Sequence, residues 1–192
     1  MKGTFAITGD PDADHLLNTD PFALLIGMLL DQQIPMERAF HSPFELRDRL
    51  GGTLDPETIS GIDPDAFAKL FAQRPALHRF PGSMAKRVQG LAQMIVDDYG
   101  GCADRVWTEA ADGGDLARRL RGLPGFGTEK ARIFTALLAK RFGVRPKGWA
   151  EAAGPFADNT PRSVADISSR AAFDQVRAWK KEQKAKGKGK AD

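Results

Sequence analysis

The chain has 192 residues, of which 42% are hydrophobic and 28% are charged, the balance of an ordinary globular protein. This length allows one substantial core or two small subdomains that share a cleft. The longest apolar stretch, residues 21–30, is much shorter than the roughly 20 residues that a membrane-spanning helix needs. The first residues soon run into an acidic segment, which is not a secretory signal pattern, so we expect a cytoplasmic protein.

The single cysteine, Cys102, limits the cofactors that the chain can hold. One cysteine cannot form an internal disulfide, a zinc site made of several thiolates or a four-cysteine iron–sulfur cluster. We therefore expect a protein without an iron–sulfur cluster or another resident cofactor.

The net charge of +3 hides an uneven distribution. Residues 180–192 contain six lysines and two acidic residues, so the rest of the chain has a net charge of −1. Residues 115–147 contain nine basic residues and two acidic residues, a local charge of +7. A basic stripe of this kind is typical of a surface that binds phosphates, and a solvated basic face is the alternative.

Helix starts are marked along the chain by a capping carboxylate before a proline, at Asp20, Asp55 and Asp63. Ser42, with Glu45 three residues later, predicts a further start with a capping box. No segment alternates between apolar and polar residues in the way that a strand requires. The sequence therefore predicts an all-α protein with about eight to ten short helices.

Residues 21–33 are apolar almost all round, which predicts a helix at the centre of a bundle. Its polar end emerges at the surface with Asp31, Gln32 and Gln33, either as caps or as contacts to a ligand. A later helix begins near Ser83 and ends at two glycines, residues 100 and 101.

The C-terminal third is predicted to contain two helices joined by a tight turn, then a long loop. The first of these helices covers residues 115–121, and the second runs from a Thr128 cap to about residue 143. Residues 144–162, rich in glycine, proline and alanine, predict the loop, and a last helix is expected over about 164–179. The lysine-rich residues 180–192 predict a disordered tail.

The turn between the two helices carries the sequence Leu123-Pro124-Gly125-Phe126-Gly127. Glycine permits a positive φ and leaves no side chain between the backbone and a ligand. The backbone amides of residues 125–128 are expected to point outward at a helix N-terminus, where the helix dipole favours an anion such as a DNA phosphate. Such a contact is independent of sequence. The alternative is a plain Schellman-type turn.

Three segments in order resemble the helix–hairpin–helix, glycine/proline-rich loop (HhH-GPD) superfamily of base-excision DNA glycosylases, which includes endonuclease III-like and 3-methyladenine DNA glycosylase II-like enzymes. Residues 21–33 resemble the buried helix that ends in a serine–glutamine motif, with Asp31 where serine is usual. Residues 84–91 are similar to the lysine-bearing helix of that family, and residues 123–131 are similar to its hairpin.

The resemblance implies two helical lobes with a DNA-binding cleft between them. Residues 1–179 would form a single domain, with lobe A at about 20–143, including the hairpin at 115–143, and lobe B made of the N-terminal segment and about 144–179. Backbone carbonyls of the hairpin would hold a monovalent cation, Na⁺ or K⁺. The residues expected to contact double-stranded DNA are Gln33, which would fill the gap left by an extruded base, and Arg121, Gly125, Phe126, Gly127, Thr128 and Lys130.

Two charged positions of the family differ in this chain. Glu129 occupies the position where bifunctional members carry a Schiff-base lysine, and Lys130 comes one residue late, about 100° around the helix, which argues against a lyase reaction. The essential aspartate of the family would fall near residues 147–149, where there is no acid. The nearest candidates are Asp158, with a residue of an Asx turn as its alternative role, and Glu151 as the rival acid.

Two functions follow from the resemblance. The first is a monofunctional DNA glycosylase that hydrolyses the N-glycosidic bond of a damaged or mispaired base. The second is a DNA-binding or damage-sensing protein that retains the hairpin and lacks the catalytic acid. In either case we expect a monomer that works on the bacterial nucleoid and has no membrane partner.

Overall fold

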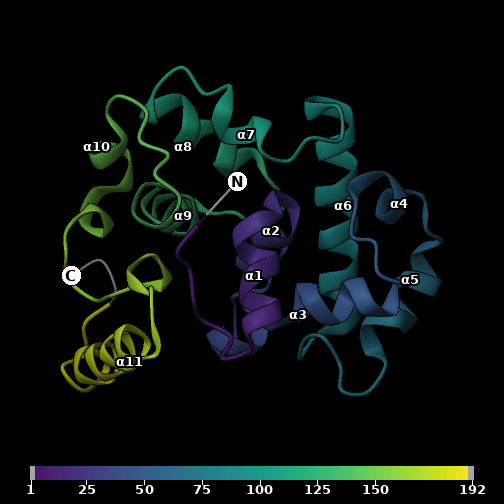
Figure 1. Ribbon diagram of the computed structural model, residues 1–192, viewed down its shortest axis with the longest axis horizontal. Coiled ribbons are helices and arrows are strands. Elements are labelled where there is room, and N and C mark those ends of the chain that lie inside the picture. The colour runs from purple at the N-terminus through teal and green to yellow at the C-terminus, as the bar shows by residue number, and fades with distance from the viewer. Residues whose placement is uncertain (1–2, 190–192) are drawn as a thin grey trace.

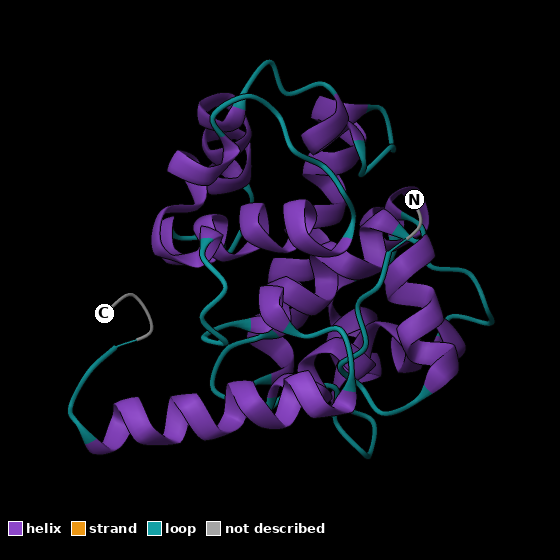
Figure 2. Cartoon of the chain, turned by 60° about the vertical axis from the view of Figure 1, so that its left-hand side comes forward, coloured by secondary structure: helices purple, strands orange, loops and turns teal. Residues whose placement is uncertain are grey.

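The fold is entirely helical over residues 3–189, the part of the chain that this computed structural model describes. Eleven α-helices and two short 3-10 helices follow one another in this range, and it contains no strand (Figure 2). The all-α prediction is confirmed. None of the described helices has the length and apolarity needed to cross a bilayer.

Aspartate caps and following prolines start four of the helices, which are α1 (Pro11–Thr19), α2 (Pro21–Leu30), α4 (Pro56–Gly61) and α5 (Pro64–Ala72). At α2 the Asp20 carboxylate accepts hydrogen bonds from the amides of Phe22 at 2.8 Å and Ala23 at 3.1 Å. The carboxylates of Asp55 and Asp63 cap α4 and α5 in the same way. The three predicted aspartate caps are therefore confirmed.

Helix α2 lies at the centre of the molecule, with α9 on one side and α6 on the other (Figure 1). Nine of its residues, 22–30, are buried, as its apolar sequence predicts. Helix α1 and helix α3 (Met36–Arg49) pack against α2, and α4 and α5 pack against the long helix α6 (Pro81–Tyr99). The short helix α7 (Arg105–Thr108) then leads into the hairpin.

The hairpin helices are α8 (Gly113–Gly122) and α9 (Thr128–Arg141). They pack against α10 (Trp149–Ala153), and α9 also contacts the two 3-10 helices, η1 (Gly154–Ala157) and η2 (Val164–Asp166). The last helix, α11 (Arg170–Ala185), packs on η2, and its C-terminal end extends away from the other helices (Figure 2).

The hairpin helices, predicted to belong to lobe A, make their main contacts with the segment after residue 143. Helix α1 likewise packs on α2 and α3, although the backbone amide of Thr4 donates to the carbonyl of Arg141 at 3.0 Å. The boundaries of the lobes and the cleft between them stay predictions.

Three local predictions are wrong. Ser42 lies inside α3, where its hydroxyl donates to the carbonyl of Arg38 at 2.8 Å, so it does not start a helix. Residues 144–162 are not a continuous loop, since α10 and η1 interrupt them. Helix α11 continues to Ala185, so residues 180–185 are helical and not disordered. The prediction for residues 190–192 lies outside the described part.

Candidate nucleic-acid interface

The turn of the hairpin has the geometry that its glycines predict. Helix α8 ends at Gly122, and the amide of Phe126 donates to the carbonyl of Leu123 at 3.1 Å, which closes the turn. Gly125 has a φ of +79°, a left-handed conformation that favours glycine. A methyl group at Gly125 would lie 3.5 Å from Cγ of Leu29, so the turn is seated closely on the end of α2.

Gly127 is different, because its backbone is extended, with φ −82° and ψ 179°, and a Cβ there would meet nothing within 4 Å. Gly127 is also the N-cap residue of α9, and Thr128 is the first helical residue. The predicted Thr128 cap is therefore wrong by one residue. No acceptor in the described part of the chain binds the backbone amides of Gly125, Gly127 or Thr128. These amides stand at a helix N-terminus with room for an anion.

Two of the residues predicted to bind DNA point into the protein. Phe126 is buried, and its ring packs against Phe134 with 5.8 Å between the centroids, so only its backbone can reach a ligand. The ammonium of Lys130 donates to the carbonyl of Leu29 at 2.9 Å and lies 5.8 Å from the Phe126 ring centroid. Lys130 thus ties the first turn of α9 to the C-terminal end of α2, where a cation is favoured by the helix dipole.

The end of α2 is also tied to α6. Gln32 donates from its carboxamide to the carbonyl of Leu29 at 2.8 Å, and Arg87 of α6 donates to the Gln32 side-chain oxygen at 3.1 Å. The next residue, Gln33, is exposed and has a φ of +56°, which is rare for a residue with a side chain. The backbone therefore turns sharply at the residue predicted to enter the duplex, and its side chain is at the surface.

Phe80 is a site residue that the sequence does not predict. It is 43% exposed, and no other large hydrophobic side chain of the described residues is exposed. The imidazole of His78 places it: Nε2 donates to the carbonyl of Gln32 at 2.9 Å, and Nδ1 accepts from the amide of Phe80 at 3.0 Å. The backbone of Phe80 is thereby linked through His78 to the end of α2 at Gln32.

His78 is 3% exposed, and burial lowers the pKa of its imidazole below the ordinary value of 6.5. Its two bonds require the neutral ring, because Nδ1 accepts the Phe80 amide. The positive charges of Lys130 and Arg87 also lower this pKa.

We expect the free energy of unfolding to fall as the pH is lowered from about 6.5 through the pKa of folded His78. The unfolded chain binds more protons than the folded chain in this window, because the folded pKa is the lower one. Denaturant unfolding at several pH values should show a steeper acid loss for wild type than for His78→Gln. The exposed His15→Gln is the control and should behave like wild type. Parallel pH profiles for wild type and His78→Gln would contradict the expectation.

The basic stripe of residues 115–147 is not a continuous positive face. Arg118 and Arg119 both pair with Asp115, and Lys140 pairs with Asp166 at 2.6 Å. Arg121 and Arg132 are exposed, and neither pairs with a carboxylate of the described residues. The charge that can reach a phosphate near the hairpin is therefore smaller than the local +7 suggests.

Asp158 lies far along α9 from the hairpin turn. Its carboxylate accepts from the amide of Thr160 at 2.9 Å and from Arg162 at 2.7 Å, and its side chain is 49% exposed. Its backbone carbonyl accepts from Lys140. Lys140 is twelve residues after Thr128, which corresponds to about 18 Å at a rise of about 1.5 Å per residue. The surroundings of Asp158 are those of an Asx turn.

Glu151 is exposed in the first turn of α10, and none of the described residues pairs with it. This helix lies beside the start of α8, where the amide of Gly113 donates to the carbonyl of Lys147 at 2.7 Å. The structure thus brings Gly125 and Lys130 of the hairpin against Leu29 at the end of α2, the helix that Gln33 follows, and places neither predicted acid at the turn. The buried Asp166 is a further carboxylate that the sequence does not predict.

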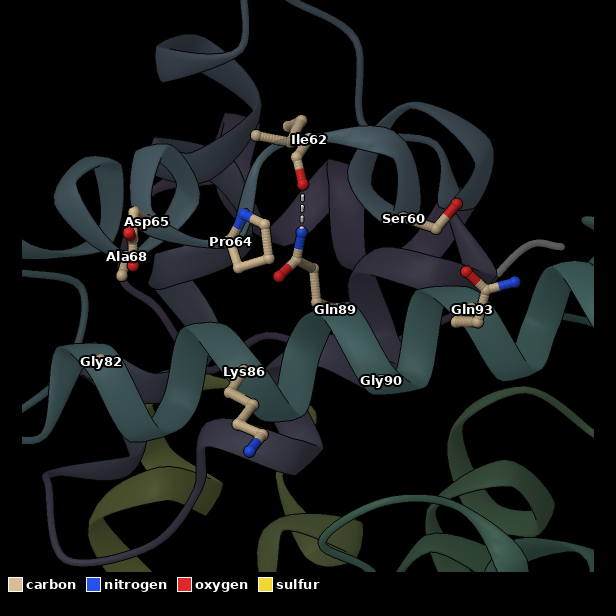
Figure 3. A pocket seen from close by; sticks show the side chains of 10 residues that line it. All are labelled: Ser60, Ile62, Pro64, Asp65, Ala68, Gly82, Lys86, Gln89, Gly90 and Gln93. Carbon is tan, nitrogen blue, oxygen red and sulfur yellow. Dashed lines mark hydrogen bonds between the residues drawn. The ribbon is translucent and has the colours of Figure 1, made fainter.

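A cavity of about 690 Å³ lies between α4, α5 and α6 (Figure 3). None of the predicted site residues lines it. Gln89 points from α6 toward Ile62 and donates to its carbonyl at 2.7 Å, which fixes the turn between α4 and α5. At the edge of this cavity, a methyl group on Gly90 of α6 would lie 3.8 Å from Cγ of Pro124, so α6 also packs against the hairpin.

An all-helical protein in which a turn rich in glycine and proline joins two helices, with backbone amides free at the start of the second, has the features of helix–hairpin–helix proteins. A family model described as the HhH-GPD superfamily base excision DNA repair protein matches residues 26–190. The chain belongs to this superfamily, as its sequence motifs predict. No curated protein and no solved structure matches it.

Proposed function

We propose that this base-excision DNA repair protein recognises a damaged or mispaired base by holding the duplex at the hairpin and entering the stack with Phe80 and Gln33. The observation that carries the proposal is the link through His78, which joins the exposed Phe80 to the polar end of α2. The same end of α2 supports Gly125 and Lys130 of the hairpin. The end of α2 is therefore linked both to the phosphate site at the hairpin and to the residue that carries the apolar wedge, and Gln33 follows directly after it.

Each part has a physical role in base extrusion. The amides of the hairpin accept a phosphate without reading sequence. An apolar side chain inserted between base steps unstacks them, which lowers the cost of extruding a base that is already poorly paired. The carboxamide of Gln33 would then occupy the gap and offer hydrogen bonds to the unpaired partner base.

We expect binding of a duplex to depend strongly on salt and weakly on sequence. If a handful of phosphates are neutralised, affinity should fall by roughly a hundredfold or more between 50 and 200 mM salt. Fluorescence anisotropy with two unrelated duplexes over that salt range measures both dependences. An affinity that stays flat over the range would contradict the proposed phosphate contacts.

Hydrolysis of the N-glycosidic bond is a second candidate function, favoured by the family match. In this reaction the base leaves with the bonding electron pair and a carboxylate stabilises the positive charge that develops on the sugar. The hydroxyl of water adds to the sugar carbon, and the proton that water loses ends on the base. Asp158 and Glu151 are the two proposed acids. Asp158 already balances the charge of Arg162, so we assign the role to Glu151 under this candidate.

We expect Glu151→Gln to lower excision by about 10²–10³-fold, the usual cost of losing one electrostatic contact in the transition state. Asp158→Asn should retain excision and lose some folding stability, because Arg162 would lose its carboxylate partner. Single-turnover excision on a panel of lesion-bearing duplexes, followed by alkaline cleavage of abasic sites, measures both variants. Loss of excision in Asp158→Asn alone would return the role to Asp158. An inactive wild type would favour recognition without catalysis.

A monovalent cation at the hairpin is part of the same proposal. The carbonyls of Pro124 and Gly125 accept no hydrogen bond from the described residues, whereas the carbonyl of Leu123 accepts one from Phe126. Two carbonyl oxygens of the turn are therefore open to Na⁺ or K⁺. The cation would link them to a phosphate oxygen and strengthen binding without base recognition.

A further inference from the structure

A second cavity, this one with a positively charged lining, lies at the far end of α9, away from the hairpin turn. Its volume is about 290 Å³, and α9, the loop around residue 160, η2 and α11 enclose it. Its polar lining comes from Lys140, Arg141, Arg145, Asn159, Asp166 and Gln175. Three of these side chains are cationic and one is a carboxylate, so the cavity has an excess of positive charge.

Arg141 forms no ion pair with a carboxylate of the described residues, although Asp166 attracts it electrostatically. Its Nε atom is buried and has no hydrogen-bond partner among the described residues, and its guanidinium forms no ion pair there. Burial lowers the pKa of this guanidinium, although an arginine remains charged at neutral pH. A buried donor without a partner is costly, so an anion that accepts from this guanidinium would relieve that cost.

The carboxylate in the cavity is already engaged. Asp166 accepts from the ammonium of Lys140 at 2.6 Å and from the amide of Ser163 at 3.0 Å. Arg145 uses Nε to donate to the carbonyl of Ala139 at 3.1 Å, which fixes its side chain beside Arg141 on the rim. Asp166 therefore pairs with Lys140, whereas neither Arg141 nor Arg145 forms an ion pair with a carboxylate of the described residues.

We propose that this cavity binds a phosphate group. The planar guanidinium of Arg141 presents donors in the fork that matches two phosphate oxygens. The carboxamides of Asn159 and Gln175, which also line the cavity, add neutral donors. The site is distinct from the hairpin, because Arg141 is thirteen residues after Thr128, which corresponds to about 20 Å along α9.

The phosphate has two sources, a backbone phosphate of a bound duplex or a free phosphate or nucleotide. Both offer the same oxygens to Arg141, so titrations with inorganic phosphate and with duplex DNA are needed to separate them. A duplex phosphate at this position would add one contact to those at the hairpin. It would therefore steepen the slope of log affinity against log salt concentration by about one.

The test is isothermal titration of the full chain with inorganic phosphate. Arg141→Gln removes the charge and should weaken phosphate binding at least tenfold. Asn159→Asp leaves Arg141 in place and puts a second carboxylate into the cavity, so it should also abolish binding. The matched control is Arg170→Gln, because Arg170 is exposed on α11 outside this cavity and pairs with Asp174.

Duplex titrations with the same variants identify the source. A weaker duplex affinity with a salt slope reduced by about one assigns the site to a DNA phosphate. An unchanged duplex affinity with lost phosphate binding assigns it to a free phosphate. The proposal is overturned if both cavity variants bind inorganic phosphate like wild type, or if wild type does not bind it and duplex affinity is unchanged in both. If Arg141→Gln does not fold, phosphate binding by Asn159→Asp decides whether the proposal holds. Gly127→Ile, which removes only the hairpin contact, should retain phosphate binding and so separates this proposal from the proposed function.

Discussion

Replacing Gly127 by isoleucine is expected to weaken duplex binding at least a hundredfold while the helical fold persists. The backbone of Gly127 is extended, and a Cβ at this position meets nothing within 4 Å, so the protein accepts the side chain. The same open space is where a phosphate must approach the amides of Gly127 and Thr128. A branched side chain there would block that approach.

Fluorescence anisotropy at low salt measures the loss of duplex binding, and circular dichroism measures whether the helical fold persists. Gly61→Ile is the matched control, since a Cβ at Gly61 also meets nothing within 4 Å and this residue lies at the end of α4. Gly125→Ala is a contrasting variant, because Gly125 has a φ of +79° and a close contact with Leu29, so it should lose stability. A Gly127→Ile variant that binds DNA like wild type would show that the hairpin only connects α8 and α9 and does not bind a phosphate.

The hairpin and the central helix could be predicted because their signals are local. Nine buried residues of α2 follow from an apolar segment, and the turn follows from two glycines and a proline at fixed spacing. The capping aspartates act through the amides two or three residues later. Each of these features is decided within a few residues of the chain.

Phe80 could not be predicted as a site residue because its exposure is a property of the tertiary structure. A phenylalanine before a helix is most often buried, and the sequence contains twelve. Its position depends on His78, which binds a carbonyl 46 residues away in the chain at Gln32. No periodicity or motif reports a contact over such a separation.

For the basic stripe and Asp158, the sequence predicts more than the structure contains: more positive charge without a partner, and a carboxylate nearer to the hairpin. Counting charges cannot show that Asp115 pairs with two arginines or that Lys140 pairs with Asp166. The family's spacing puts its aspartate near residues 147–149, and the candidate Asp158 instead lies beyond α10 and η1, at the other end of α9. Residues 180–185 are predicted to be disordered because they are rich in lysine, but lysine is also a good helix former, and these residues are helical.

Phe80→Ala is expected to remove base extrusion while leaving the hairpin contact to the backbone. An inserted aromatic ring that stacks on a base contributes about 1–3 kcal/mol by alanine substitution, which corresponds to about a 5- to 150-fold loss of affinity for a mismatched duplex. The ring is 43% exposed, so its removal should leave the thermal midpoint of unfolding almost unchanged.

The measurement uses 2-aminopurine placed in a mismatch, because its fluorescence rises when the base leaves the stack. Wild type should raise the signal, and Phe80→Ala should bind the duplex without raising it. Phe80→Leu is the matched control, since leucine retains an apolar side chain that can enter a base step, and it should restore part of the signal. Arg79→Gln separates the ring from its neighbouring cation, which lies 5.4 Å from the ring centroid, and should keep most of the signal. A full fluorescence increase in Phe80→Ala would show that Phe80 does not enter the duplex and would leave Gln33 as the residue that opens the stack.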